Sequence, residues 1–160
     1  MSEPGAFACR RCGQCCHGEG GIVLDGRDQE RLAAHMGLGR EEFLAGYTVA
    51  RAGKVLLTVG AGGDCVFFQA GCGVHPARPD ICRAWPFFKG NLIDAASFEL
   101  SRDYCPGIAP GASHAAFARQ GAAYLRGNGL VKSGEPGAAE ALKLSPALLA
   151  AMLEADPDDA

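Results

Sequence analysis

The feature that most constrains this sequence is a crowded run of cysteines near its beginning, Cys9, Cys12, Cys15 and Cys16. These cysteines are poor disulfide partners for one another, because a disulfide needs two suitably separated α-carbons. A Cys-x-x-Cys spacing instead lets two thiols reach one metal from a single turn. Gly13 can adopt a positive φ and let backbone N–H groups turn toward the sulfurs. The run therefore predicts an irregular metal-binding loop.

Four more cysteines complete the set of eight: Cys65, Cys72, Cys82 and Cys105. We expect the first three to return in space to the N-terminal run. Cys105 precedes a proline, as in some ferredoxin ligand sets, but it could equally be a small buried apolar residue. Eight thiols would suit two four-thiolate sites, one such site with spare thiols, or a thiolate-bridged multinuclear site. All eight are candidate metal ligands, and the sequence does not assign them to sites.

Composition excludes several other classes of protein. The chain has 160 residues and a formal net charge of -3, and it contains no basic run of the kind that binds nucleic acid. Its longest apolar run, near residues 147–153, is far shorter than the roughly 20 residues of a membrane span. The N-terminus lacks the pattern of a secretory signal. We therefore expect a cytoplasmic location, where thiols stay reduced.

Local patterns predict a mixed fold. We expect strands at 22–24, 48–49 and 55–59, with a further short strand candidate at 66–68. We expect helices at 26–36, 40–47 and 112–126, one or two helical turns at 77–84, and a last helix from 146 to about 155. Residues 91–101 are undecided between strand and loop, and 130–144 read as a linker. The fold class is α+β, a small metal-stabilised domain with short strands, three to five helices and irregular cysteine-bearing loops. The predicted domains are a cysteine-cluster domain at 7–107 and a helical C-terminal extension at 108–160, packed on it or tethered to it.

Several motifs accompany the cysteines. They are Phe7-x-Cys9-x-x-Cys12-Gly13-x-Cys15-Cys16, Ile22-x-Leu24 leading into Asp28-x-x-Arg31-Leu32, Cys65-x-Phe67, Gly71-Cys72-Gly73, and Arg78-Pro79-x-x-Cys82-Arg83-x-Trp85-Pro86-Phe87. In these motifs the chain resembles the CxxCxxCC family, a cysteine-cluster family named for zinc or iron chelation. Some of its members carry the label Fe–S oxidoreductase. The resemblance covers about residues 7–107 and implies metal binding without specifying a substrate.

Two arginines flank Cys82 and are candidate cofactor-binding residues. Arg78 and Arg83 could offset thiolate charge or hold a carboxylate or phosphate group. Structural pairing with Asp or Glu is the favoured alternative. The sequence contains no Ser-His-Asp arrangement, phosphate-binding glycine loop or nicotinamide fingerprint, so no catalytic residue can be named.

The sequence supports three interpretations. The first is an iron–sulfur protein, with a 4Fe–4S cluster, acting in electron transfer or as a component of an oxidoreductase with a protein redox partner. The second is a zinc-binding structural or interaction module. The third is a protein that stores or delivers zinc or iron. Clusters and zinc both accept four thiolates, so spacing alone does not separate them.

Overall fold

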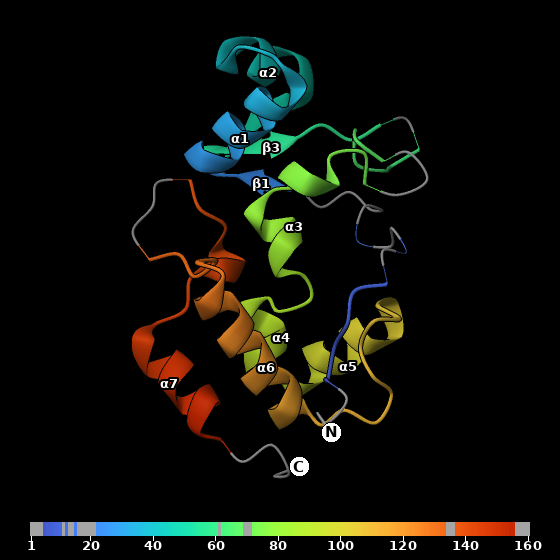
Figure 1. The fold of residues 1–160 in the computed structure, drawn as a ribbon, viewed down its shortest axis with the longest axis vertical. Coiled ribbons are helices and arrows are strands. Elements are labelled where there is room, and N and C mark those ends of the chain that lie inside the picture. The colour runs from blue at the N-terminus through green and yellow to red at the C-terminus, as the bar shows by residue number, and fades with distance from the viewer. Residues whose placement is uncertain are drawn as a thin grey trace. The chain divides into compact units, whose positions relative to one another are not determined.

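A computed structural model of the chain describes residues 5–10, 12, 15, 22–60, 62–68, 72–133 and 137–155. Its contacts divide the chain into two compact units (Figure 1). Unit 1 contains Met1–Cys12, Ala84–Ser133 and Glu140–Ala160, and unit 2 contains Gly13–Arg83 and Gly134–Ala139. The domain boundary expected after residue 107 stays a prediction.

Unit 2 is built on a small antiparallel sheet with the strand order β1-β3-β2. The strands are β1 (Val23–Leu24), β2 (Thr48–Arg51) and β3 (Lys54–Leu57), with Val23 opposite Leu56 and Thr48 opposite Leu57. Ala52 and Gly53 join β2 to β3 with φ values of 52° and 76°. Two successive positive φ values match the right-handed twist of a tight hairpin. The hairpin expected between 48 and 59 is therefore confirmed, with a shorter second strand.

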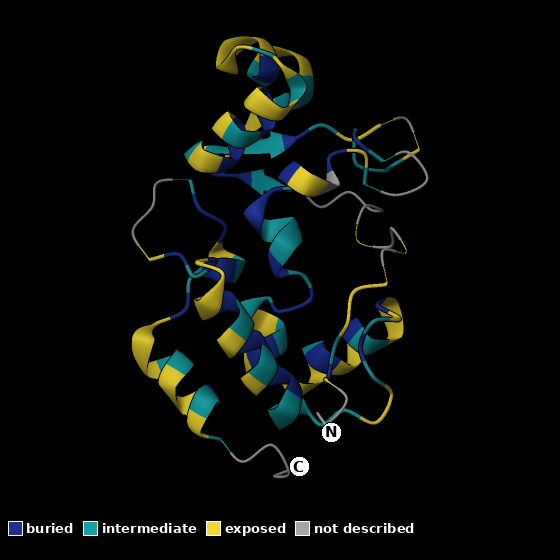
Figure 2. Cartoon of the chain, in the orientation of Figure 1, coloured by how far each residue is buried: buried dark blue, intermediate teal, exposed yellow. Residues whose placement is uncertain are grey.

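The helices α1 (Gly26–Met36) and α2 (Arg40–Tyr47) lie where the sequence predicts them. Asp25 caps α1 by accepting the N–H of Asp28, and Gly37 ends it at φ 69°. Such a cap contributes about 1 kcal/mol. Most of α2 is exposed (Figure 2). Phe43 is nevertheless completely buried. Its ring joins Leu24, Leu32 and Leu57 in the core of unit 2.

The strand candidate at 66–68 is wrong. The Phe68 N–H donates to the carbonyl of Cys65 at 2.9 Å, which closes a turn at these residues. Isolated bridges join Val59 to Cys65 and Phe68 to Cys72. The segment is apolar enough for a strand, but the turn uses its backbone groups locally. A single turn of 3₁₀ helix (His75–Ala77) follows, and then α3 (Asp80–Ala84), which is the helix expected within 77–84.

Residues 91–101 are neither strand nor loop. They lie in two short helices of unit 1, α4 (Lys89–Ile93) and α5 (Ala95–Tyr104). Asp94 separates them, and its side chain caps α5 by accepting the N–H of Ser97 at 2.9 Å. Leu92 and Phe98 are buried, one from each helix. Each helix has only one or two buried residues. The apolar positions are therefore too few to reveal a helical period in the sequence.

The helix α6 (His114–Gly127) lies in the middle of unit 1, in contact with α4 and with α7 (Pro146–Glu154) (Figure 1). An added Cβ at Gly121 would lie 2.6 Å from the Phe87 ring, so glycine is required for this close packing. The linker expected at 130–144 is wrong for its described residues. Leu130, Leu142 and Leu144 are buried, which means that the chain here packs tightly. The α+β fold class is confirmed, with the cysteines mostly in loops.

Candidate metal centre

The structure describes seven of the eight cysteines, and none of the seven is in a disulfide. Cys9 and Cys12 are exposed residues of unit 1, and Cys105 is buried there. Cys15 in unit 2 is exposed, and the other described cysteines of that unit are partly buried: Cys65, Cys72 and Cys82. Cys16 lies outside the described residues. In neither unit do three described cysteine sulfurs lie within 4.8 Å of one another.

Cys65 and Cys72 share one small loop of unit 2. The turn at Cys65 and the bridge between Phe68 and Cys72 carry the chain back on itself. Burial raises the pKa of the Cys65 thiol, the N–H of Phe67 lowers this pKa by hydrogen bonding to the sulfur, and the charge of Cys72 raises it. Two thiols therefore lie within electrostatic reach, with a backbone donor directed at one of them. Backbone N–H groups directed at sulfur stabilise thiolates in metal sites.

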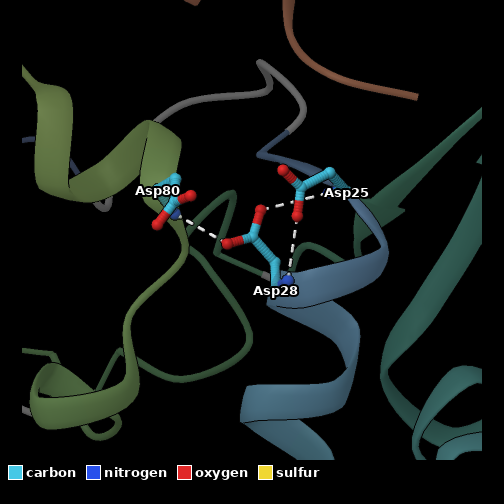
Figure 3. A group of neighbouring side chains, drawn as sticks. All are labelled: Asp25, Asp28 and Asp80. Carbon is cyan, nitrogen blue, oxygen red and sulfur yellow. Dashed lines mark hydrogen bonds between the residues drawn. The ribbon is translucent and has the colours of Figure 1, made fainter. Parts of the chain in front are cut away.

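Cys82 lies in α3, and a buried ionic network holds the beginning of that helix (Figure 3). The carboxylate of Asp28 accepts the N–H of Asp80 at 2.9 Å and the guanidinium of Arg31 at 2.7 Å. Arg31 also donates to the side chain of Asp80 at 3.1 Å and to the carbonyl of Arg78 at 3.0 Å. The network therefore joins α1 to the segment that carries Cys82, across 52 residues of sequence.

Asp28 is the most constrained member of this network. It is only 2% exposed. Burial raises its pKa to about 6, and the charges of Asp80 and Asp25 add to this effect, whereas the N–H groups of these two residues lower the pKa. The guanidinium of Arg31 also favours the carboxylate form. Burial is the largest of these effects, so Asp28 becomes easier to protonate in the folded protein than in an unfolded chain.

Asp25, Asp28 and Asp80 have carboxylate oxygens within 4.8 Å of one another, the single group of this kind found among the described residues. Oxygens so arranged can hold a hard cation. Here, however, Asp25 and Asp28 already accept each other's backbone N–H groups, and Asp28 and Asp80 are paired with Arg31. We therefore interpret the group as a structural network.

The contact between Asp28 and Asp80 was not among the sequence-based expectations. Two signals could have suggested it. Asp28 and Arg31 lie three residues apart and so share one helix face. Asp80 follows a proline that fixes the entry into α3.

The two arginines near Cys82 have different surroundings. The guanidinium of Arg83 lies 3.2 Å from the carboxylate of Asp80, which is the structural pairing considered as the alternative to cofactor binding. The carbonyl of Arg78 accepts from Arg31, so its backbone is part of the network. A role for either side chain toward a cofactor stays a prediction.

In unit 1, the segment after Cys105 runs antiparallel to residues 5–8, which form an arm that leads into Cys9. An antiparallel bridge pairs Phe7 with Ile108. The N–H of Ala8 donates to the carbonyl of Gly107 at 3.0 Å. The structure therefore brings the backbone that leads into the N-terminal run beside the Cys105 segment.

The candidate metal centre consists of cysteine thiols on turns and helix ends. Backbone and charged groups fix two of the segments that carry these cysteines. Residues 8–106 match the model of the CxxCxxCC family, described as "Putative zinc- or iron-chelating domain". The chain belongs to this family. The match covers all eight cysteines and both residues of the Asp28–Arg31 pair.

Membership in the CxxCxxCC family identifies metal binding, through zinc or iron, as the property of this domain. Comparisons with curated proteins and with solved structures gave no match. Within the described part of the chain, no helix combines the length and the hydropathy that crossing a bilayer requires.

Proposed function

We propose that the clustered cysteines hold a 4Fe–4S iron–sulfur cluster that serves in electron transfer. The observation that carries this proposal is the Cys65–Cys72 loop, where the Phe67 N–H is directed at the Cys65 sulfur and the Cys72 thiol lies within electrostatic reach of it. When bound, such a cluster exchanges single electrons with a redox partner. The candidate ligands are the eight cysteines: Cys9, Cys12, Cys15, Cys16, Cys65, Cys72, Cys82 and Cys105.

The thiols near the cluster would need compensation for their negative charge. The N–H of Phe67 already hydrogen bonds to the Cys65 sulfur and lowers the pKa of that thiol. Arg83, one residue after Cys82, is one-third exposed and supplies positive charge in the same segment. An all-sulfur donor set with such compensation fits iron, because soft thiolates bind iron–sulfur clusters well.

A structural zinc site is the second candidate function. The turn at Cys65 supports this function as well, because a cysteine followed by a tight turn with an N–H directed at its sulfur also suits a zinc thiolate. A tetrathiolate zinc would then stabilise unit 2, whose sheet consists of strands of only two to four residues. In either case we expect a protein partner, no nucleic acid and a cytoplasmic location.

Anaerobic purification of the full chain, followed by elemental analysis and absorption spectroscopy, distinguishes the two functions. We expect stoichiometric iron and sulfide and a broad band at about 400 nm, where iron–thiolate charge transfer absorbs. A colourless protein with stoichiometric zinc would reject the cluster and support the zinc site. A protein that binds neither metal after anaerobic reconstitution would reject both.

Replacement of single cysteines tests the ligands. We expect Cys12→Ser and Cys16→Ser each to lose metal, because both lie in the crowded cysteine run within the matched residues 8–106. Cys105→Ala gives the comparison within unit 1, since Cys105 is 7% exposed and can serve as a ligand or as a core residue. Unchanged metal content and thermal stability in Cys12→Ser and Cys16→Ser would show that these two residues are not essential ligands.

A further inference from the structure

An amide side chain of α6 holds the arm that leads into the cysteine run. The N–H of Phe7 donates to Oε1 of Gln120 at 3.1 Å, and Nε2 of Gln120 donates to the carbonyl of Phe7 at 2.8 Å. One side chain therefore satisfies both backbone groups of a single residue that lies 113 positions away. A neighbouring β-strand would satisfy these groups in the same way.

The opposite side of the arm is fixed as well. Phe7 bridges Ile108, the N–H of Ala8 donates to Gly107, and the N–H of Ala109 donates to Ala6 at 2.8 Å. A Cβ added at Gly107 would lie 2.6 Å from the Ala8 carbonyl oxygen. Only a residue without a side chain lets the two segments approach this closely.

The ring of Phe7 anchors the arm in the core of unit 1. It lies edge-on to Phe87, with the ring centroids 5.3 Å apart and the ring planes at 82°. Phe87 is 1% exposed and also contacts Phe117 of α6. The two hydrogen bonds of Gln120, and the packing of the Phe7 ring on Phe87, therefore both attach the arm to α6.

Cys9 follows Phe7 by two residues, so this attachment sets the position of its backbone. The N–H of Ala8, the residue before Cys9, donates to the carbonyl of Gly107, which lies two residues after Cys105. A cysteine on a fixed backbone loses less conformational entropy when it binds metal than one on a mobile terminus.

We propose that Gln120 is a positioning residue of the metal centre, which holds the arm so that Cys9 and Cys12 are presented to metal in a fixed orientation. The proposal rests on the proposed function only in that the cysteines bind metal, and it applies to iron and zinc alike. Gln120 and Phe7 both lie outside the matched residues 8–106, so α6 contributes to the centre from beyond the family segment. Loss of such a supporting contact typically weakens metal affinity about 10- to 100-fold.

The test uses the full chain, reduced and freed of metal, with Co²⁺ and Zn²⁺ as probes. Gln120→Met keeps the volume and helix propensity of the side chain but removes both hydrogen bonds. Gln120→Glu keeps the acceptor for the Phe7 N–H and replaces the donor. Arg126→Ala, at an exposed position of the same helix, is the matched control.

We expect the affinity for Zn²⁺, measured by competition with a chromophoric chelator, to fall about 10- to 100-fold in Gln120→Met. It should fall less in Gln120→Glu and stay unchanged in Arg126→Ala. The sulfur-to-cobalt charge-transfer band should lose intensity in Gln120→Met, because fewer thiolates reach the metal. Hydrogen exchange at the Phe7 amide should accelerate, while the amide of Leu125 in α6 stays protected.

The outcomes separate this proposal from the proposed function. A wild-type chain that binds neither Co²⁺ nor Zn²⁺ and cannot be reconstituted with iron would reject the proposed function itself. Wild-type affinity and an unchanged cobalt spectrum in Gln120→Met, despite faster exchange at Phe7, would overturn the positioning role. If Gln120→Met lost its fold, as seen from the fluorescence of Trp85 in unit 1, Gln120→Glu would decide by the same two readouts.

Discussion

The two units anchor their cysteine-bearing segments by different chemistry. In unit 2, the buried carboxylate of Asp28 and the partly exposed guanidinium of Arg31 hold the helix that carries Cys82. In unit 1, the neutral amide of Gln120 and the ring of Phe7 hold the arm that leads to Cys9. Ionic contacts are strong and directional, but each buried charge depends on its partner. The two hydrogen bonds of the neutral Gln120 amide are weaker, and their strength does not change with pH.

The largest expected effect comes from removing the cation of the ionic anchor. Arg31→Ala leaves the carboxylates of Asp28 and Asp80 buried without this partner, which should cost about 3–5 kcal/mol of unfolding free energy. Urea denaturation followed by circular dichroism measures it. Arg27→Ala, at an exposed position of α1, serves as the control and should change little. Equal, small losses of unfolding free energy in both variants would mean that charge does not hold the Cys82 helix in unit 2.

The second prediction uses pH to separate the two anchors. The pKa of Asp28 is about 6 in the folded protein and close to 3.8 when unfolded, so between these values the unfolded chain has lost a proton that the folded protein keeps. The stability that Asp28 contributes is therefore complete below the unfolded pKa and decreases as pH rises to about 6. Above that pH it is constant. Relative to Asp28→Asn, the wild type should lose up to roughly 3 kcal/mol between pH 4 and pH 6.

Urea denaturation of both proteins at each pH checks this prediction, and the difference between them removes titrations that they share. Gln120→Met gives the comparison for unit 1, because its difference from the wild type should not vary across the same range. A difference between wild type and Asp28→Asn that stayed constant from pH 4 to pH 6 would contradict the raised pKa.

Packing of the helices gives a third contrast between the units. Gly121 of α6 has no room for a methyl group, since an added Cβ would lie 2.6 Å from Phe87 and 2.7 Å from Leu92. Gly121→Ala should therefore destabilise unit 1 by roughly 1–2 kcal/mol, after its gain in helix propensity is subtracted. The fluorescence of Trp85 during urea denaturation reports on this unit. Increased stability would show that Phe87 and Leu92 can move aside.

The smallest expected change in unfolding free energy comes from a glycine-to-alanine substitution in a helix of unit 2. Gly46 of α2 has nothing within 4 Å of an added Cβ and lies in an exposed part of the helix. Gly46→Ala should stabilise unit 2 by about 0.5 kcal/mol through helix propensity alone. Hydrogen exchange in α2 and a urea denaturation curve both measure this gain. Destabilisation would indicate a contact of α2 that its exposure does not suggest.

Much of the fold could be predicted because its signals are local. The Asp25 cap, the stop at Gly37 and the cap at Ser145 each act within a few residues of their own position. Residues 66–68 were predicted wrongly because an apolar triplet fits a strand and a turn alike. Residues 130–144 were predicted wrongly because glycine and small residues resembled a linker, whereas Leu130 and Leu142 pack into unit 1.

The same distinction between local signals and distant contacts applies to the candidate metal centre. Thiol spacing predicted a metal-binding domain from local sequence, because coordination by neighbouring side chains is itself a local property, and the family match confirms metal binding. The assignment of the cysteines as the ligands stays a prediction. The contacts that hold the cysteine-bearing segments in place, in contrast, form between residues far apart in the sequence. Asp28 meets Asp80 across 52 residues, and Gln120 meets Phe7 across 113. Hydrogen-bonding side chains are common, and their partners are chosen only when folding brings distant segments together.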